Sequence, residues 1–252
     1  MPPPLPPGEL GHSLGPRDAR VTLGGHLDYV VRGHSKPRAE SQEPLSSVIR
    51  ICQACEVVKP SFNASAQCPY SKKTYTTIRK QVAPHYRNAS FRFVFHHQVQ
   101  PWHPQSTLMH EAGMAVAKVG GVEGFWKFSD AMFEYQEDFY DIAINNMTRP
   151  QVYEQLAKLA AKSANVSKDA VLQQLAFPEG DPHPGSIISK DLKWYIKEGR
   201  QMGVHVSPTL SVNGLIVDSS SSWKLDEYRD LLDPLLTESH DEGWKTLMHI
   251  TF

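Results

Sequence analysis

The four residues Cys68-Pro69-Tyr70-Ser71 constrain the fold of this chain more than any other stretch. A helical pattern follows them and runs to Pro84. A proline is tolerated in the first turn of a helix because the N–H that it lacks has no partner there. The pattern therefore predicts a helix with the Cys68 sulfur at its N-terminus, where the helix dipole and free N–H groups stabilise a thiolate. An ordinary cysteine beside a turn is the other interpretation of an isolated pattern of this kind.

The composition is that of a globular chain and points to no polyanionic partner. Of 252 residues 40% are apolar, and 26 basic residues balance 27 acidic ones. Three cysteines are too few for a disulfide scaffold and are typical of a reducing compartment. Residues 1–7 have neither the basic nor the apolar region of a signal peptide, and no apolar run approaches the roughly 20 residues of a membrane helix. The sequence thus predicts a cytoplasmic protein that binds neither nucleic acid nor membrane.

Hydrophobic periodicity divides most of the chain into strands and helices. Residues 1–20 are rich in Pro and Gly and are expected to form a disordered arm, residues 21–236 a single domain, and residues 237–252 a polar tail. The expected elements are strands over 21–31 and 91–97, a strand within 204–212 that has Pro208 at its start, a strand over 215–217, helices over 69–84, 189–202 and 223–236, and a run of helices over 106–177. Asn213-Gly214 predicts a tight hairpin turn.

One long segment fits none of these elements. Residues 31–67 mix charge, proline and serine, and a structureless loop of this length is uncommon in a compact domain. The segment contains Cys52-Gln53-Ala54-Cys55, a spacing found in zinc sites and in dithiol redox centres. No second pair of zinc ligands has the right spacing, and Pro60 leaves no room for the helix that a redox centre needs. A chance match is therefore the favoured interpretation.

The order of the elements, together with three motifs, resembles the thioredoxin fold with a helical insertion, as in DsbA-like oxidoreductases. The motifs are Cys68-Pro69-Tyr70-Ser71, Ser207-Pro208-Thr209 and the Asn213-Gly214 turn. The resemblance covers residues 10–236 and is strongest to a eukaryotic thioredoxin-like subgroup with a C-P-[FY]-S motif, to which Gln98–Ser106 is also similar. It implies an α/β fold in which a large helical insertion, residues 106–200, lies between the second strand and the cis-Pro strand.

The resemblance also implies an active site. In this family the proline that corresponds to Pro208 is cis and faces the active-site cysteine across a substrate groove; a cis bond before proline costs little. Cys68 would be the nucleophile, and Ser71 would hydrogen-bond its thiolate. The implied substrate-binding residues are Pro69, Tyr70, Ser207, Pro208 and Thr209.

The chain departs from this family at two places. Ser71 stands where a dithiol enzyme has its second cysteine, so the site can form a mixed disulfide but cannot close an internal one. Residues 31–67 separate Leu27-Asp28-Tyr29-Val30 from Cys68, whereas the family runs directly from its strand into the active site. The segment begins with valine, whose codons start with GT, and ends with glutamine, which has a CAG codon, as at intron borders. We interpret it as a translated intron or a gene-model error, with a genuine surface loop as the alternative.

Three functions remain open from the sequence. The first is a monothiol oxidoreductase that exchanges with glutathione or protein thiols at Cys68 and binds no cofactor. The second resembles kappa-class glutathione transferases and chromene carboxylate isomerases, in which a serine near this helix start activates glutathione; Ser71 would then be catalytic. The third is a non-catalytic module that binds peptides along the Pro208 groove, because a fold does not fix a function.

Three histidines invite a metal interpretation. His96 and His97 are neighbours in a predicted strand, and His103 follows in a loop between two prolines. Adjacent strand residues point to opposite faces, so His96 and His97 cannot easily bind one ion. The sequence therefore predicts no metal site.

Overall fold

The computed structural model describes residues 10–30, 70–180, 183 and 185–237, so the three cysteines, Pro69 and the whole 31–67 segment lie outside the described residues. Within the described ranges no helix combines the length and apolar character needed to cross a membrane. The elements in chain order are β1 (His12–Leu14), β2 (Val21–Leu27), α1 (Tyr70–Thr77), the π-helical turn η1 (Ile78–Val82), α2 (Ala83–His85), β3 (Phe91–His97), α3 (Pro104–Glu134), the 3₁₀ turn η2 (Gln136–Phe139), α4 (Arg149–Ala164), α5 (Lys168–Leu175), α6 (Ser189–Gln201), β4 (Thr209–Val212), β5 (Leu215–Val217) and α7 (Leu225–Thr237).

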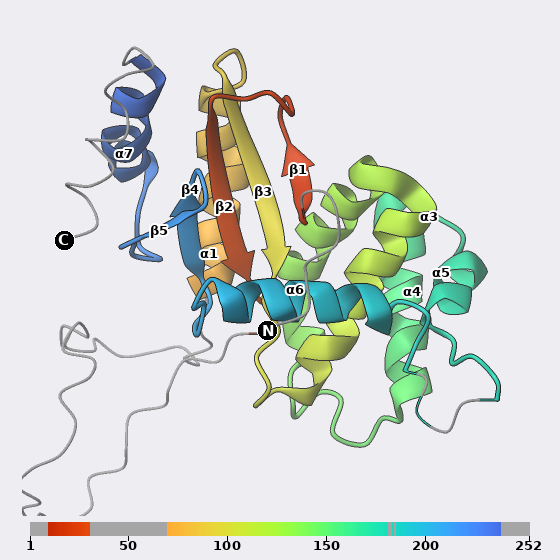
Figure 1. Ribbon diagram of the computed structural model, residues 1–252. Helices are drawn as coiled ribbons and strands as arrows, with labels where there is room; N and C mark the ends of the chain where they lie inside the picture. The colour runs from red at the N-terminus through yellow and green to blue at the C-terminus, as the bar shows by residue number, and fades with distance from the viewer. Residues whose placement is uncertain (1–9, 31–69, 181–182, 184, 238–252) are drawn as a thin grey trace, which may run out of the picture.

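The strands form one mixed sheet in the order β1-β3-β2-β4-β5 (Figure 1). β2 and β3 are parallel, with Leu27 opposite His97 at their last pair, and every other neighbouring pair is antiparallel. Because parallel strands end at the same edge of a sheet, the residues after Leu27 and after His97 are brought together. This edge carries the candidate site.

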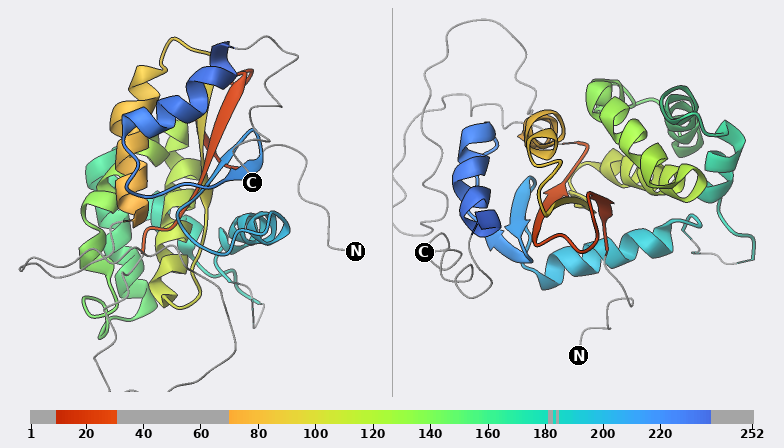
Figure 2. Two further views of the ribbon diagram at one scale, coloured as in Figure 1. Left: turned by 90° about the vertical axis from the view of Figure 1, so that its left-hand side faces the viewer. Right: turned by 90° about the horizontal axis from the view of Figure 1, so that it is seen from above.

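Helices cover both faces of the sheet, and β3 alternates between them. Phe95 contacts Tyr75 of α1 and Phe125 of α3, whereas His96 contacts Glu198 of α6. Figure 2 shows α6 crossing one face of the sheet while α1 and α3 lie on the other. A strand with both faces covered is buried at nearly every position, and six of the seven residues of β3 are buried, Arg92 and His97 among them.

Residues 10–20 do not belong to a disordered arm, and this corrects the expectation for residues 1–20 as far as the structure describes them. Strand β1 pairs antiparallel with β3 at the edge of the sheet, with His12 opposite Phe95. Gly11 and Gly15 flank it at φ values of 127° and 115°, which other residues rarely adopt. Three paired residues are too few to leave a periodic signal in the sequence, so only the tertiary contact with β3 defines this strand.

The helical run between β3 and β4 extends over residues 104–201, close to the predicted 106–200. Its first helix, α3, spans 31 residues and contains a kink at Gly121, where φ is +66°. Figure 1 shows α3, α4 and α5 packed together beside the sheet. α6 then returns across the sheet and leads to β4.

The strand that the sequence predicts with Pro208 at its start is β4, which begins at Thr209. The Thr209 hydroxyl donates to the carbonyl of Val206 at 2.8 Å, which closes a turn before the strand. The hairpin turn agrees with the sequence, since Asn213 and Gly214 have φ values of 49° and 85°.

Candidate active site at the start of helix α1

The first turn of α1 is anchored to the end of β2. Tyr70, two positions after Cys68, is the first residue of the helix and is 47% exposed. Ser71 is buried, and its hydroxyl accepts the N–H of Asp28 at 3.5 Å. The helix therefore begins beside the C-terminal end of β2, and its described start at Tyr70 agrees with the helix predicted over 69–84. Cys68 and Pro69 themselves are outside the described residues.

Asp28 is a fully buried carboxylate beneath this helix start. Its Oδ1 accepts hydrogen bonds from the Val30 N–H at 2.9 Å, the Ser106 hydroxyl at 2.9 Å and His110 Nε2 at 3.2 Å. Its Oδ2 accepts the Gln100 N–H at 3.1 Å. Hydrogen bonds to the charged form are what make a buried carboxylate tolerable. The donors come from the segments that follow β2 and β3 and from the start of α3, so Asp28 ties all three to one point.

Gln100 connects Asp28 to the loop before β4. Its side-chain Nε2 donates to the Ser207 hydroxyl at 3.0 Å, while its backbone N–H binds Asp28. The Ser207–Pro208 peptide bond is cis. The predicted substrate-binding residue Ser207 is thus linked through Gln100 and Asp28 to Ser71 by hydrogen bonds.

Tyr70 and Pro208 line one pocket of about 380 Å³. Its remaining lining residues follow β5 and are Asp218, Ser219, Ser220, Ser221 and Trp223. Two predicted substrate-binding residues from distant parts of the sequence therefore meet at one surface. The other two predicted substrate-binding residues within the described ranges, Ser207 and Thr209, are not among the residues that line this pocket. Thr209 is the first residue of β4, and Ser207 contacts Gln100.

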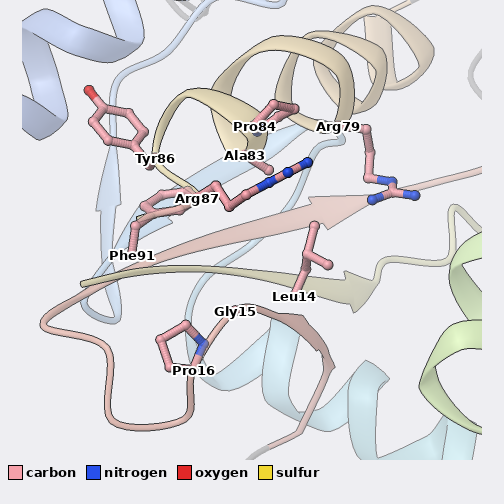
Figure 3. Close-up of a pocket in the computed structure, with 9 residues that line it drawn as sticks. All are labelled: Leu14, Gly15, Pro16, Arg79, Ala83, Pro84, Tyr86, Arg87 and Phe91. Atoms are coloured by element: carbon pink, nitrogen blue, oxygen red, sulfur yellow. The ribbon is translucent and has the colours of Figure 1, made fainter. Parts of the chain in front are cut away.

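A second pocket lies at the opposite end of β3. It is lined by Phe91 at the start of β3, by Leu14 at the end of β1 with Gly15 and Pro16 after it, and by residues of η1, of α2 and just after α2, namely Arg79, Ala83, Pro84, Tyr86 and Arg87 (Figure 3). It shares no residue with the Tyr70–Pro208 pocket. It is therefore separate from the candidate active site.

The three histidines singled out in the sequence occupy different surroundings. His97 Nδ1 lies 2.7 Å from His110 Nδ1 in the core, whereas His96 Nδ1 lies 2.9 Å from Glu198 on the opposite face of the sheet. His103 Nδ1 lies 3.2 Å from Asp141. In the part of the chain that the structure describes, no three His, Cys, Asp or Glu side chains are placed to hold a metal ion.

Sequence reasoning missed Asp28, Gln100 and Ser106 as residues of this site. The only available signal was a carboxylate inside the apolar run Leu27–Val31, because acidic residues are rarely buried unless they are paired or hydrogen-bonded. Gln100 and Ser106 carry no such signal. Their role depends on the proximity of three chain segments.

No protein-family model matches the chain, and no curated protein matches it. Solved structures do. A Pseudomonas syringae protein provisionally described as a protein-disulfide isomerase is 18% identical, with a TM-score of 0.57 over 87% of this chain and 96% of that one. A thioredoxin-like oxidoreductase from Silicibacter pomeroyi DSS-3 is 12% identical, with a TM-score of 0.53 over 91% and 94% of the two chains. A periplasmic thioredoxin-like protein from Salmonella enterica serovar Typhimurium is 12% identical, with a TM-score of 0.52 over 90% and 91%.

These similarities, with the five-stranded sheet and the helical insertion after β3, confirm the predicted thioredoxin-like fold. At this level of identity they establish the fold alone. The C-P-[FY]-S subgroup stays a prediction. The cytoplasmic location expected from the sequence is not supported by them, since one of the three is described as periplasmic.

Proposed function

We propose that this chain is a thiol–disulfide oxidoreductase that works with a single active-site thiol, Cys68. The observation that carries the proposal is the junction of the α1 start with the loop before β4, where Tyr70 and Pro208 share a pocket. The thioredoxin-like proteins with the same fold, of which one is described as an oxidoreductase, support this chemistry.

The reaction needs one cysteine and no bound cofactor. A Cys68 thiolate attacks one sulfur of a substrate disulfide; a new S–S bond forms, the substrate S–S bond breaks, and the released thiolate takes up a proton. The thiolate of glutathione then attacks the substrate sulfur of the mixed disulfide and releases the Cys68 thiolate. Glutathione is thus a co-substrate, and the substrates are disulfides of small molecules or proteins.

Ser71 supports the thiolate in this proposal. Its hydroxyl accepts the Asp28 N–H, and a hydroxyl that accepts one hydrogen bond still has a proton to donate, in this proposal to the thiolate. The competing role, in which Ser71 itself activates a bound glutathione, is less well supported because Ser71 is only 1% exposed.

The test is the pH dependence of Cys68 alkylation in the full chain carrying Cys52→Ser and Cys55→Ser, so that one thiol reports. We expect a midpoint well below the roughly 8.5 of an ordinary cysteine, because the helix N-terminus stabilises the thiolate. Ser71→Ala should raise that midpoint. Intact mass should show a mixed disulfide after treatment with glutathione disulfide.

Cys68→Ser in the same background is the control and should show neither reaction. A midpoint at or above that of a free cysteine, with no mixed disulfide, would sink the oxidoreductase proposal. Glutathione binding that survives Cys68→Ser and is lost in Ser71→Ala would instead favour the transferase-like function.

A further inference from the structure

Three histidines form a continuous row that ends at Asp28. His110 Nε2 lies 3.2 Å from Asp28 Oδ1, His110 Nδ1 lies 2.7 Å from His97 Nδ1, and His97 Nε2 lies 3.0 Å from His12 Nε2. Each internal ring therefore uses both of its nitrogens within the row. The four residues come from β1, the end of β2, the end of β3 and α3, and only the fold brings them together.

The donors and acceptors in the row can be assigned from Asp28 outward. The Asp28 carboxylate already accepts two backbone N–H groups and a hydroxyl, so it accepts from His110 Nε2 as well. A neutral imidazole has one N–H and one bare nitrogen. His110 Nδ1 then accepts the N–H of His97 Nδ1, and His97 Nε2 accepts the N–H of His12 Nε2. All three N–H groups point toward Asp28.

The surroundings keep His12 and His97 neutral. Burial, with a smaller contribution from His96, lowers the pKa of His12 to about 3. Burial, with His110, His12 and His96, lowers the pKa of His97 well below its usual value. The two phenols that face the row are also neutral, since burial raises the pKa of Tyr29 and raises that of Tyr195 to about 12.

Packing holds the rings in line. His12 stacks on Phe125 with ring centroids 3.6 Å apart, and the His110 ring lies 4.8 Å from that of Tyr29. A Cβ at Gly113 would lie 3.1 Å from the Tyr29 hydroxyl and 3.5 Å from His97 Cε1, so this position in α3 has little room for a side chain.

We propose that this row is a proton relay between the edge strand β1 and the candidate active site. A proton taken up at His12 Nδ1 releases the Nε2 proton to His97 Nε2, which releases its Nδ1 proton to His110 Nδ1, which releases its Nε2 proton to the Asp28 carboxylate. Each ring ends neutral with its tautomer reversed, and transfer in the opposite direction restores the first state. No bond other than N–H and O–H changes.

The inner end of the relay is placed for thiol chemistry, and this use of it rests on the proposed function. Asp28 is bound to Ser71 through its backbone and, through Gln100, to Ser207, so it adjoins both sides of the candidate site. Thiol–disulfide exchange releases a proton from one thiol and returns one to another. The outer end, His12, is partly exposed in the edge strand.

The first experiment tests the relay without reference to Cys68. In the full-length, ¹⁵N-labelled protein, imidazole nitrogen shifts near neutral pH should show His12 and His110 protonated on Nε2 and His97 on Nδ1. A proton on Nε2 of His97, or a positively charged ring at any of the three positions, would overturn the relay.

The second experiment separates proton transfer from a structural role. In His12→Gln the side-chain amide still donates to His97 but cannot pass a proton on, and His12→Phe keeps only the stacking on Phe125. For both variants we expect solvent exchange of the His97 and His110 ring protons to slow by about tenfold or more, with a similar fall in mixed-disulfide formation at Cys68.

His26→Gln is the matched control, because His26 is a buried histidine outside the row, and it should leave both rates unchanged. Unchanged ring-proton exchange in His12→Gln would overturn the relay. Slowed ring-proton exchange with an inert Cys68 would overturn the proposed function and leave the relay in place.

Discussion

Two buried carboxylates have different tasks in this molecule. Asp28 receives its hydrogen bonds from the segments around the candidate site, whereas Glu111 receives them from the helical insertion. Glu111 accepts from Arg149, Tyr153, Ser186 and Ser189, and so joins α3 and α4 to the start of α6 and the segment just before it. Because a buried charge is tolerated only when its hydrogen bonds are satisfied, both residues depend on partners from several elements.

Replacing Glu111 tests whether its hydrogen bonds to these elements stabilise the fold. In Glu111→Gln one acceptor oxygen becomes an NH₂ group, which cannot accept from Arg149 and Tyr153 or from the two serines. We expect a loss of about 1–3 kcal/mol in the free energy of unfolding, measured in urea. Glu154→Gln, which alters a carboxylate at the surface of α4 that pairs with Lys158 and Lys168, should have a much smaller effect because surface ion pairs contribute little. Equal effects of the two substitutions would contradict the stabilising role of the buried Glu111 hydrogen bonds.

At the scale of elements, α3 connects the candidate site with the core. Its first two turns provide Ser106 and His110 to Asp28, and its second half provides Phe125, which stacks on His12. The kink at Gly121 separates the two halves. The helix therefore contacts both ends of the histidine row, with His110 at Asp28 and Phe125 at His12.

The kink depends on a backbone conformation that glycine allows. A Cβ at Gly121 would meet nothing within 4 Å, so the cost of Gly121→Ala comes from its backbone conformation, with φ at +66° and ψ at −167°, a region that is essentially restricted to glycine. We expect a loss of about 1 kcal/mol in stability. Gly124→Ala, three residues later at helical φ with only ordinary contacts, should instead be neutral or stabilising by up to about 1 kcal/mol. Thermal unfolding of the two variants decides the matter, and a stabilised Gly121→Ala would refute the role of the kink.

At the scale of the whole molecule, buried histidines should make the fold sensitive to acid. Burial, with a contribution from His96, lowers the pKa values of His12 and His26 from 6.5 to about 3. Below pH 6.5 the unfolded chain therefore binds protons that the folded chain excludes. The stabilisation is complete above that pH and is lost as the pH falls toward 3, by up to about 1.4 kcal/mol per pH unit for each histidine.

Urea unfolding at a series of pH values measures this slope. His26→Gln should make it shallower, whereas His85→Gln, at an exposed position, should not. Stability that is independent of pH in the acid range would contradict neutral burial of these rings.

The sequence suggests that residues 31–67 are not part of the native protein, and this remains a hypothesis. If the segment is a translated intron or a gene-model error, protein from the native source will lack it, and Val30 will be followed directly by Cys68. Peptide mass spectrometry of that material checks this. A peptide from residues 38–50 would show that the segment is a genuine part of the protein.

The sequence alone determined the local elements of this protein. Helical periodicity after Pro69, the run 91–97 rich in aromatic residues and the Asn213-Gly214 turn each encode their own geometry, because periodicity and turn chemistry act over a few residues. Together with the family resemblance they were enough to predict the thioredoxin-like fold and to single out Tyr70 and Pro208.

Only the tertiary structure decided how distant residues meet. Strand β1 exists through its pairing with β3, and His12 and His97, 85 residues apart, become neighbours through that pairing and the packing of α3. Likewise Asp28 looks like a residue of a short apolar run until Gln100, Ser106 and His110 surround it. Such contacts depend on packing between segments, which no local pattern contains, so the interior network of the candidate site could not be read from the sequence.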